Sequence, residues 1–221
     1  MFPISDVIPS RTRPVVTIGL IVLNTAAYLY QLQLDATAVQ RLVFGSGVIP
    51  ASFTFADAIT SLFLHADVVH IGGNMVFLWI FGDNVEDRLG HVRYLAFYLL
   101  CGIAGALAQT FAEPASFVPM IGASGAVAGV MGAYFLLYPH SRVLTVVFLI
   151  FFLDIIEIPA VFLLGVWFLL QLAHGALAPD GPGGGIAFWA HAGGFITGAV
   201  VGVVVRMRAP TDRSYWKARV K

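Results

Sequence analysis

Six apolar segments constrain the fold of this chain more than any other feature, because an α-helix needs about 20 mostly apolar residues to cross a bilayer. They lie at about 15–32, 67–87, 92–111, 123–138, 157–177 and 189–206. Charged residues make up only 11% of the chain, against about 25% in soluble domains. The sequence therefore predicts an all-α, polytopic membrane protein. We expect a membrane domain at 15–207, a short N-terminal tail at 1–14 and a basic C-terminal tail at 208–221, with no soluble domain at either end.

The stretch 142–178 leaves the number of spans open, because it is too long for one span and slightly short for two. Pro159 indicates a helix start that follows an interfacial segment. Residues 33–66 form a long first loop with apolar stretches of its own, and loops of that length are usually functional or partly embedded. The glycine-rich run 180–185 predicts a connector before the last helix.

The basic residues decide between the two span counts, because Lys and Arg favour cytoplasmic loops. With six spans and both termini in the cytoplasm, only Arg41 of the 12 Lys and Arg residues lies outside. A seventh span would put the basic C-terminus outside. We therefore expect a six-transmembrane-helix bundle with both termini cytoplasmic.

Net charge and cysteine content limit the other classes of function. A formal net charge of zero gives no indication of nucleic acid binding. Cys101 is the single cysteine, which excludes an intrachain disulfide and a cysteine-based metal cluster.

Polar side chains at one depth are the main functional signal, because such groups are costly in hydrocarbon and are usually retained for function. Asn74, Ser124 and His191 each precede the inner end of their segment by 14 or 15 residues. At about 1.5 Å per residue, all three lie about 21–23 Å above the cytoplasmic boundary. In a hydrocarbon core about 30 Å thick, that is one plane below the outer surface. His70 lies one helical turn before Asn74 on the same face.

The chemistry of these four side chains fits acyl transfer. Ser124 is a candidate nucleophile, and His191 is a candidate general base that takes its proton and passes it to the leaving amine. Ser124 also begins an apolar helix, where unpaired N–H groups and the helix dipole stabilise a developing oxyanion. His70 and Asn74 add side-chain donors. Because no carboxylate within the membrane has an evident place as a third member, we expect a Ser-His dyad.

Glycines recur at helical spacing on the segments of Ser124 and His191. Small faces of this kind let two helices approach closely. We therefore expect the two side chains to come within hydrogen-bond reach. The glycines are Gly125, Gly129 and Gly132 on the first segment and Gly193, Gly194, Gly198 and Gly202 on the second.

Four motifs, in this order, resemble those of the rhomboid family of intramembrane serine proteases, and together they cover essentially the whole chain. The first pair is His70-Ile71-Gly72-Gly73-Asn74 and the stretch from Gly82 to Gly90. The second pair is Gly122-Ala123-Ser124-Gly125 with Gly132, and Ala190-His191-Ala192-Gly193-Gly194 with Gly198.

The resemblance implies a six-helix bundle, without a metal or cofactor, that cleaves single-pass transmembrane substrates in the lipid bilayer near their outer end. It assigns Ser124 as nucleophile and His191 as base, with His70, Asn74 and the Ser124 amide as oxyanion donors. Some relatives carry a tyrosine four residues after the serine that stacks on the catalytic histidine, and here that position is Ala128. The Trp-Arg pair often found in the first loop is missing near Ala56. The compact size resembles the basic prokaryotic form, which indicates a bacterial cytoplasmic (inner) membrane.

Three other functions remain open at this point. A zinc protease would use His65, His70 and His191, although no His-Glu-x-x-His occurs. A proteolytically silent relative would bind transmembrane clients, and a channel or small transporter would line its pathway with the same polar groups.

Two further expectations concern individual segments. Glu86 is expected to be a structural cap. The aromatic residues Phe162, Trp167 and Phe168 are expected to face lipid. Because 157–177 has few small residues, we also hypothesise that this helix packs loosely and acts as a lateral gate for substrate.

Overall fold

The computed structural model describes residues 2–149, 152–177 and 187–208. The predicted connector 180–185 and residues 209–221 of the C-terminal tail lie outside the described residues. The main helices are α1 (Val15–Gln31), α2 (Ala36–Ser46), α3 (Phe55–Thr60), α4 (Val68–Leu89), α5 (His91–Ala112), α6 (Ser124–Leu137), α7 (Ala160–Leu177) and α8 (Phe188–Arg208). The remaining elements are the strands β1 (Phe2–Asp6), β2 (Arg142–Leu149) and β3 (Phe152–Pro159) and the 3₁₀ turns η1 (Pro50–Ser52) and η2 (Ser61–Phe63).

Helices lie at all six places where the sequence predicts spans, namely α1, α4, α5, α6, α7 and α8. Among the described residues, three of them (α5, α7 and α8) are long and apolar enough to cross a membrane. A fourth span exists if α3 and η2 form one broken span with α4, from which they are bent by 95°. Helices α1 and α6 are shorter, with 17 and 14 residues. The chain is thus an integral membrane protein, and the six-span count and the side of the termini stay predictions.

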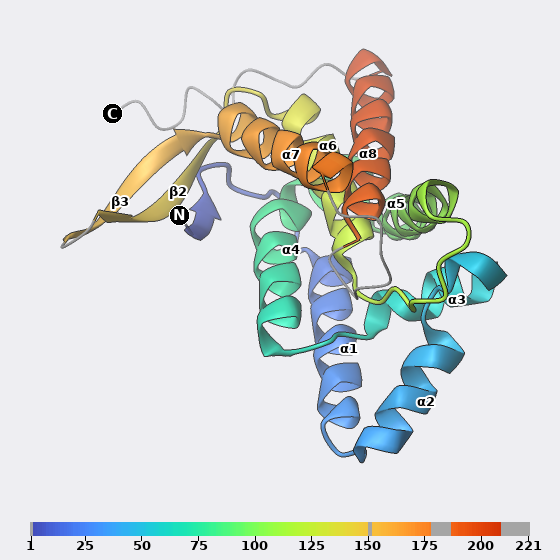
Figure 1. The fold of residues 1–221 in the computed structure, drawn as a ribbon. Coiled ribbons are helices and arrows are strands. Elements are labelled where there is room, and N and C mark those ends of the chain that lie inside the picture. Colours follow the sequence, from blue (N-terminus) through green and yellow to red (C-terminus); the bar gives the residue numbers. More distant parts are fainter. Residues whose placement is uncertain (1, 150–151, 178–186, 209–221) are drawn as a thin grey trace.

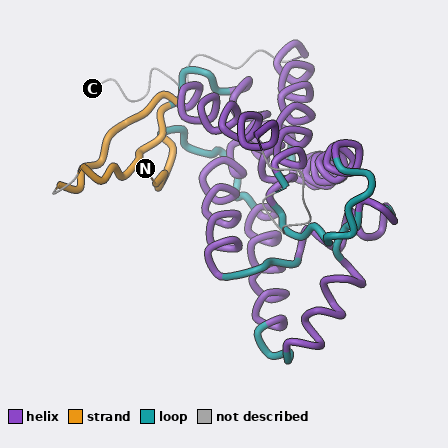
Figure 2. Tube along the Cα trace, viewed as in Figure 1, coloured by secondary structure: helices purple, strands orange, loops and turns teal. Residues whose placement is uncertain are grey.

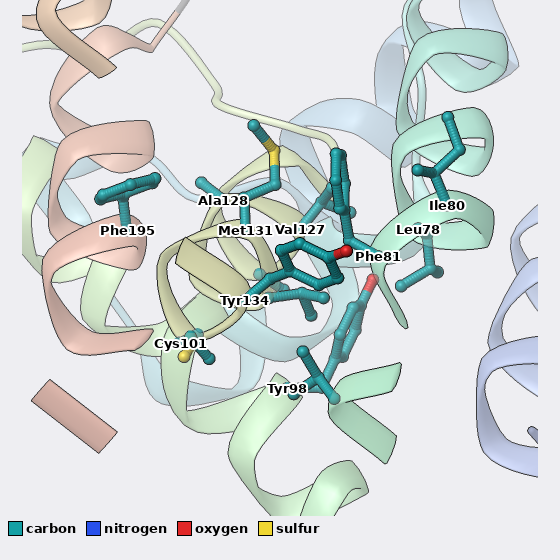
Figure 3. Packing of buried hydrophobic residues seen from close by; sticks show 14 of the residues in the cluster. Leu78, Ile80, Phe81, Tyr98, Cys101, Val127, Ala128, Met131, Tyr134 and Phe195 are labelled. Carbon is teal, nitrogen blue, oxygen red and sulfur yellow. The ribbon is translucent and has the colours of Figure 1, made fainter. Parts of the chain in front are cut away.

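Helix α6 is the centre of the bundle. Every residue from 125 to 134 is buried, and α4, α5, α7 and α8 contact it (Figure 1). A helix that is apolar on all sides is expected to be buried on all sides. Figure 3 shows Tyr134 of α6 beside Phe81 of α4, with ring centroids 4.9 Å apart in an edge-to-face arrangement. The start of α6 is therefore held by packing along the rest of the helix.

Glycines bring the backbones of α6 and α8 into direct contact. A methyl group on Gly194 would overlap the carbonyl oxygen of Gly125, and one on Gly198 would overlap that of Gly129. Gly132 lies against the backbone of Phe195 in the same way. These three contacts place α8 along α6. A Cβ atom on Gly125 would also lie 3.5 Å from the Ala190 carbonyl oxygen, so the first turns of the two helices lie side by side.

The fold is mostly helical, as expected, but it also contains three strands that an all-α protein would lack. Residues 142–159 contain an antiparallel hairpin of β2 and β3, and β1 pairs with β2 to give the order β1-β2-β3 (Figure 2). Residues 157–159, expected in a helix, end β3 instead. The cause is composition, because the hairpin is rich in β-branched and aromatic residues, which favour strands. Within the described residues, 142–177 holds one helix and not two.

Strand β1 is joined to the C-terminal half of α6 by side chains. Tyr134 Oη donates to Asp6 Oδ2 at 2.5 Å, and it shares a hydrogen bond of 2.7 Å with Ser141 Oγ. Residues 2–6, expected to be part of a short tail, therefore form a strand that is attached to the bundle.

Glu86 joins α1, α4 and α5. Its fully buried carboxylate accepts hydrogen bonds from the backbone N–H groups of Val16 and Thr17, at 2.9 and 2.8 Å, and from the Thr17 hydroxyl. His91 Nδ1 lies 2.6 Å from the same carboxylate. These bonds cap the first turn of α1, whose N–H groups have no partner within the helix. The expected role of Glu86 as a structural cap is confirmed.

Candidate active site

Ser124 is the first residue of α6, and Gly122 shapes the turn that leads into it. Gly122 has φ = +123°, a conformation that L side chains rarely adopt, and its N–H donates to the Ser61 carbonyl at 2.9 Å. A Cβ atom on Gly122 would lie 2.6 Å from the His70 ring and 3.8 Å from Asn74 Nδ2. The turn before Ser124 therefore packs directly against the two side chains predicted as oxyanion donors.

Within the described ranges, side chains cap the first turns of α4 and α8 but not that of α6. Asp67 accepts from the backbone N–H groups of Val69 and His70 at 2.8 Å, which fixes the start of α4. Gln109 Oε1 accepts from the N–H groups at the start of α8, at 3.1 and 3.3 Å. Ala123, at the N-cap of α6, makes no side-chain cap hydrogen bond. The first N–H groups of α6 are therefore available to a ligand.

His70 and Asn74 lie one turn apart on α4. His70 Nδ1 lies 3.5 Å from the Ala66 N–H, which donates to it, and this contact favours the tautomer with the ring proton on Nε2. Asn74 is buried, and its Nδ2 has no hydrogen-bond partner in the described part of the chain. An unpaired buried donor costs about 1–3 kcal/mol. The amide of Asn74 is thus a donor without an acceptor.

The four predicted side chains line one cavity of about 1120 Å³. His70 and Asn74 reach it from α4, Ser124 from α6 and His191 from α8. Ser124 and His191 make no direct hydrogen bond to each other within the described residues. Catalytic hydrogen bonds are often long in a site without substrate. The structure therefore brings together all four residues that the depth argument singled out.

His191 is held from α7 by two residues that the sequence analysis did not assign to the site. The His191 side chain is only 8% exposed, and its Nδ1 lies 2.7 Å from Gln171 Oε1. Trp167, one turn before Gln171, faces the His191 ring at a centroid distance of 5.8 Å and an interplanar angle of 35°. Gln171 is the only amide side chain in α7, so a lone amide in an apolar helix was the available signal.

The expectation that the aromatic residues of α7 face lipid is wrong for two of the three. Phe162 is 64% exposed. Phe168 instead stacks on Phe195 of α8 at 4.5 Å, and Trp167 contacts both His191 and Phe195. The reason is that α8 presents ring-bearing residues to α7, and aromatic pairs stabilise such contacts.

The donor set of the zinc alternative is not assembled in the described part of the chain. Within it, no group of three or more His, Cys, Asp or Glu side chains has a geometry that could hold a metal ion. The rings of His65 and His70 meet edge to face at 5.1 Å. Gln31 holds the backbone of His65 by two hydrogen bonds of 3.1 and 3.2 Å.

Comparison with known proteins gives matches over most of the chain. A family model described as the Rhomboid domain matches residues 52–208. The mitochondrial Rhomboid protein 1 of Saccharomyces cerevisiae is 33% identical over 150 residues, which are 65% of this chain and 40% of the yeast protein. The rhomboid protease GluP of Bacillus subtilis is 39% identical over 75 residues, or 34% of this chain and 14% of that protein. The rhomboid protease AarA of Providencia stuartii is 27% identical over 136 residues, or 53% of this chain and 48% of that protein. The chain thus spans less than half the length of each of these three relatives.

Proposed function

We propose, because the chain belongs to the rhomboid family, that it is an intramembrane serine endopeptidase in which Ser124 and His191 act as nucleophile and base. The observation that carries the proposal is the convergence of Ser124, His191, His70 and Asn74 on one cavity from three helices. Two of the relatives are named rhomboid proteases. The matched segments cover only part of those proteins, so the activity of this chain is inferred from its own site.

In the proposed reaction, Ser124 and His191 form an acyl-enzyme and then hydrolyse it. Ser124 Oγ attacks the carbonyl carbon of a peptide bond while His191 takes the hydroxyl proton. The resulting imidazolium gives that proton to the leaving amine, and the C–N bond breaks to leave an acyl-enzyme. His191 then removes a proton from water, whose oxygen attacks the ester carbon. The bond between that carbon and Ser124 Oγ breaks, the imidazolium returns its proton to Oγ, and the acyl group leaves as a carboxylic acid.

The oxyanion of each tetrahedral intermediate needs donors that are already in position. The uncapped N–H groups lie in the first turn of α6, which begins at Ser124, and they can donate to the oxyanion. The unpaired Asn74 Nδ2 and the Nε2 proton of His70 supply two further donors. An acceptor at this position would complete the hydrogen bonds of Asn74, which supports the assignment of His70 and Asn74 to oxyanion stabilisation.

The length of α6 supports a cleavage position inside the membrane. Its 14 residues span about 21 Å, whereas the hydrocarbon core is about 30 Å thick. If the inner end of α6 lies at the cytoplasmic boundary, Ser124 lies below the outer surface. We therefore infer that the substrates are single-pass transmembrane segments cut near their outer end. The distribution of Lys and Arg favours cytoplasmic termini. We propose a bacterial inner membrane as the location.

Covalent labelling tests this function and separates it from the alternatives. A fluorophosphonate reacts with an activated serine, so the wild type is expected to carry an adduct on Ser124 that mass spectrometry locates. Labelling disappears in Ser124→Ala, falls strongly in His191→Ala and does not respond to a chelator. An adduct on another residue, or full labelling of His191→Ala, would contradict the proposal. Cleavage that is sensitive to a chelator and resistant to the phosphonate would favour the zinc protease. Substrate binding without labelling or cleavage would favour the silent relative. Flux that Ser124→Ala does not change would favour the channel or transporter.

A further inference from the structure

We propose that Gln171 is a positioning residue that fixes the tautomer and orientation of His191, so that the site works as a Ser-His-Gln arrangement and not as a bare dyad. The inference rests on the proposed serine protease function. The neutral amide of Gln171, on α7, takes the place that a carboxylate has in a triad. Its contact with His191 explains how that ring is oriented.

The hydrogen bond of Gln171 determines which nitrogen of His191 can act as a base. Gln171 Oε1 lies 2.7 Å from His191 Nδ1, and a carbonyl oxygen only accepts hydrogen bonds. Nδ1 therefore carries the ring proton, and Nε2 keeps the lone pair that a general base needs. The opposite tautomer would put the proton on Nε2 and leave the site without a base. The partner on Nδ1 thus determines whether Ser124 can be activated.

Burial makes this hydrogen bond more important than one at a surface. His191 is 8% exposed, so water does not readily replace a lost partner on its ring. A buried ring nitrogen without a partner costs more than an exposed one. Because Gln171 lies in the apolar helix α7, its amide oxygen also gains a hydrogen bond from this contact.

Trp167 supports the same ring from the same helix face. It lies four residues before Gln171, and side chains at that spacing lie one above the other on a helix. Its ring contacts that of His191 at 5.8 Å, and both Trp167 and Ala128 line the cavity. Helix α7 therefore contributes both a hydrogen bond and a ring contact to His191.

Two substitutions separate positioning from simple packing. Gln171→Met keeps a side chain of similar length but removes the acceptor, so Nδ1 loses its partner. Gln171→Glu keeps the acceptor and adds a negative charge, which stabilises the imidazolium form of His191. Leu170→Met, at an exposed neighbouring position of α7, is the matched control. For each variant, kcat, KM and the pH profile of kcat are measured on a transmembrane peptide in proteoliposomes.

We expect Gln171→Met to lower kcat about tenfold, the loss of one hydrogen bond that orients the base, with little change in KM. Gln171→Glu keeps most of kcat, and the acidic limb of its pH profile moves to higher pH. Leu170→Met behaves as the wild type. If Gln171→Met does not reach the membrane, the pH profile of Gln171→Glu decides.

Wild-type kcat and pH profile in Gln171→Met, or an unmoved pH profile in Gln171→Glu, would overturn the inference. These results leave the proposed function intact as long as Ser124→Ala is inactive. Cleavage by Ser124→Ala would instead remove the proposed function itself.

Discussion

Asn74 carries a buried amide whose Nδ2 has no partner in the described part of the chain. A group in this state does not stabilise the fold, and its retention is explained if the hydrogen bond forms with a reaction intermediate. The same reasoning applies in reverse to Glu86, whose carboxylate is fully paired and serves the structure. For these two residues, hydrogen-bond pairing agrees with the roles proposed here, chemistry for Asn74 and folding for Glu86.

Asn74→Ala should lower kcat about 10²- to 10³-fold, the loss expected when one oxyanion donor is removed. Thermal stability should be kept, because the folded protein loses no hydrogen bond from Nδ2. Asn74→Asp is the matched control, since it keeps the shape and removes the donor, and it should be as inactive as Asn74→Ala. Kinetics and melting temperature in the same detergent check both expectations. A large drop in melting temperature with unchanged kcat would show a structural role instead.

At the scale of elements, the apolar segments predicted the six helices α1, α4, α5, α6, α7 and α8, because about 20 apolar residues in a row have few other structures available. Helices α2 and α3 lie in the stretch 33–66, which was predicted as a loop. The hairpin at 142–159 was missed for a physical reason. Its residues are apolar and β-branched, and what identifies them as strands is pairing with each other and with residues 2–6, about 140 positions away. Gln171 was missed because α7 is apolar on nearly all sides, so its sequence does not show which face meets α8.

The attachment of β1 should depend on pH through Asp6. Burial raises the pKa of Asp6 from 3.8 to about 7, the negative charge of Asp83 on α4 adds to the rise, and the hydrogen bond from Tyr134 opposes it. Between pH about 4 and 7, the attached strand holds a proton that the detached strand releases. Attachment is therefore strongest below pH 4, weakens up to about pH 7 and changes little above it.

Hydrogen exchange of the β1 amides tests this, after correction for the intrinsic exchange rate. Protection should fall between pH 5 and pH 8 in the wild type and should be flat in Asp6→Asn, whose side chain does not titrate. Equal pH dependence in both proteins would assign the effect to another group.

The two roles proposed for helix α7 make opposite demands, because a gate must move whereas Gln171 must stay in contact with His191. Only 11% of its span is buried, against 39% for α5 and 33% for α8. A crosslink between α7 and α4 should therefore block cleavage of membrane-embedded substrates while His191 stays oriented and Ser124 still reacts with a small phosphonate. Intact cleavage by the crosslinked protein would refute the gate.

At the scale of the whole molecule, the sequence predicted which four residues share a site better than it predicted how they are held. Depth along each helix follows from counting residues, and this brought His70, Asn74, Ser124 and His191 to one cavity. Rotation of one helix about its axis relative to its neighbours depends on packing, so the contacts of Gln171 and Trp167 with His191 needed the structure. The glycine contacts between α6 and α8 connect the two levels, because they place both first turns side by side.

Cleavage of a single-pass transmembrane substrate in proteoliposomes tests the central claim most directly. The wild type, Ser124→Ala and His191→Ala are compared at equal amounts of folded protein, with Leu170→Met as the control for substitution in the bundle. We predict cleavage by the wild type and Leu170→Met, and none by the other two variants. Cleavage by Ser124→Ala at the wild-type rate would show that this serine is not the nucleophile.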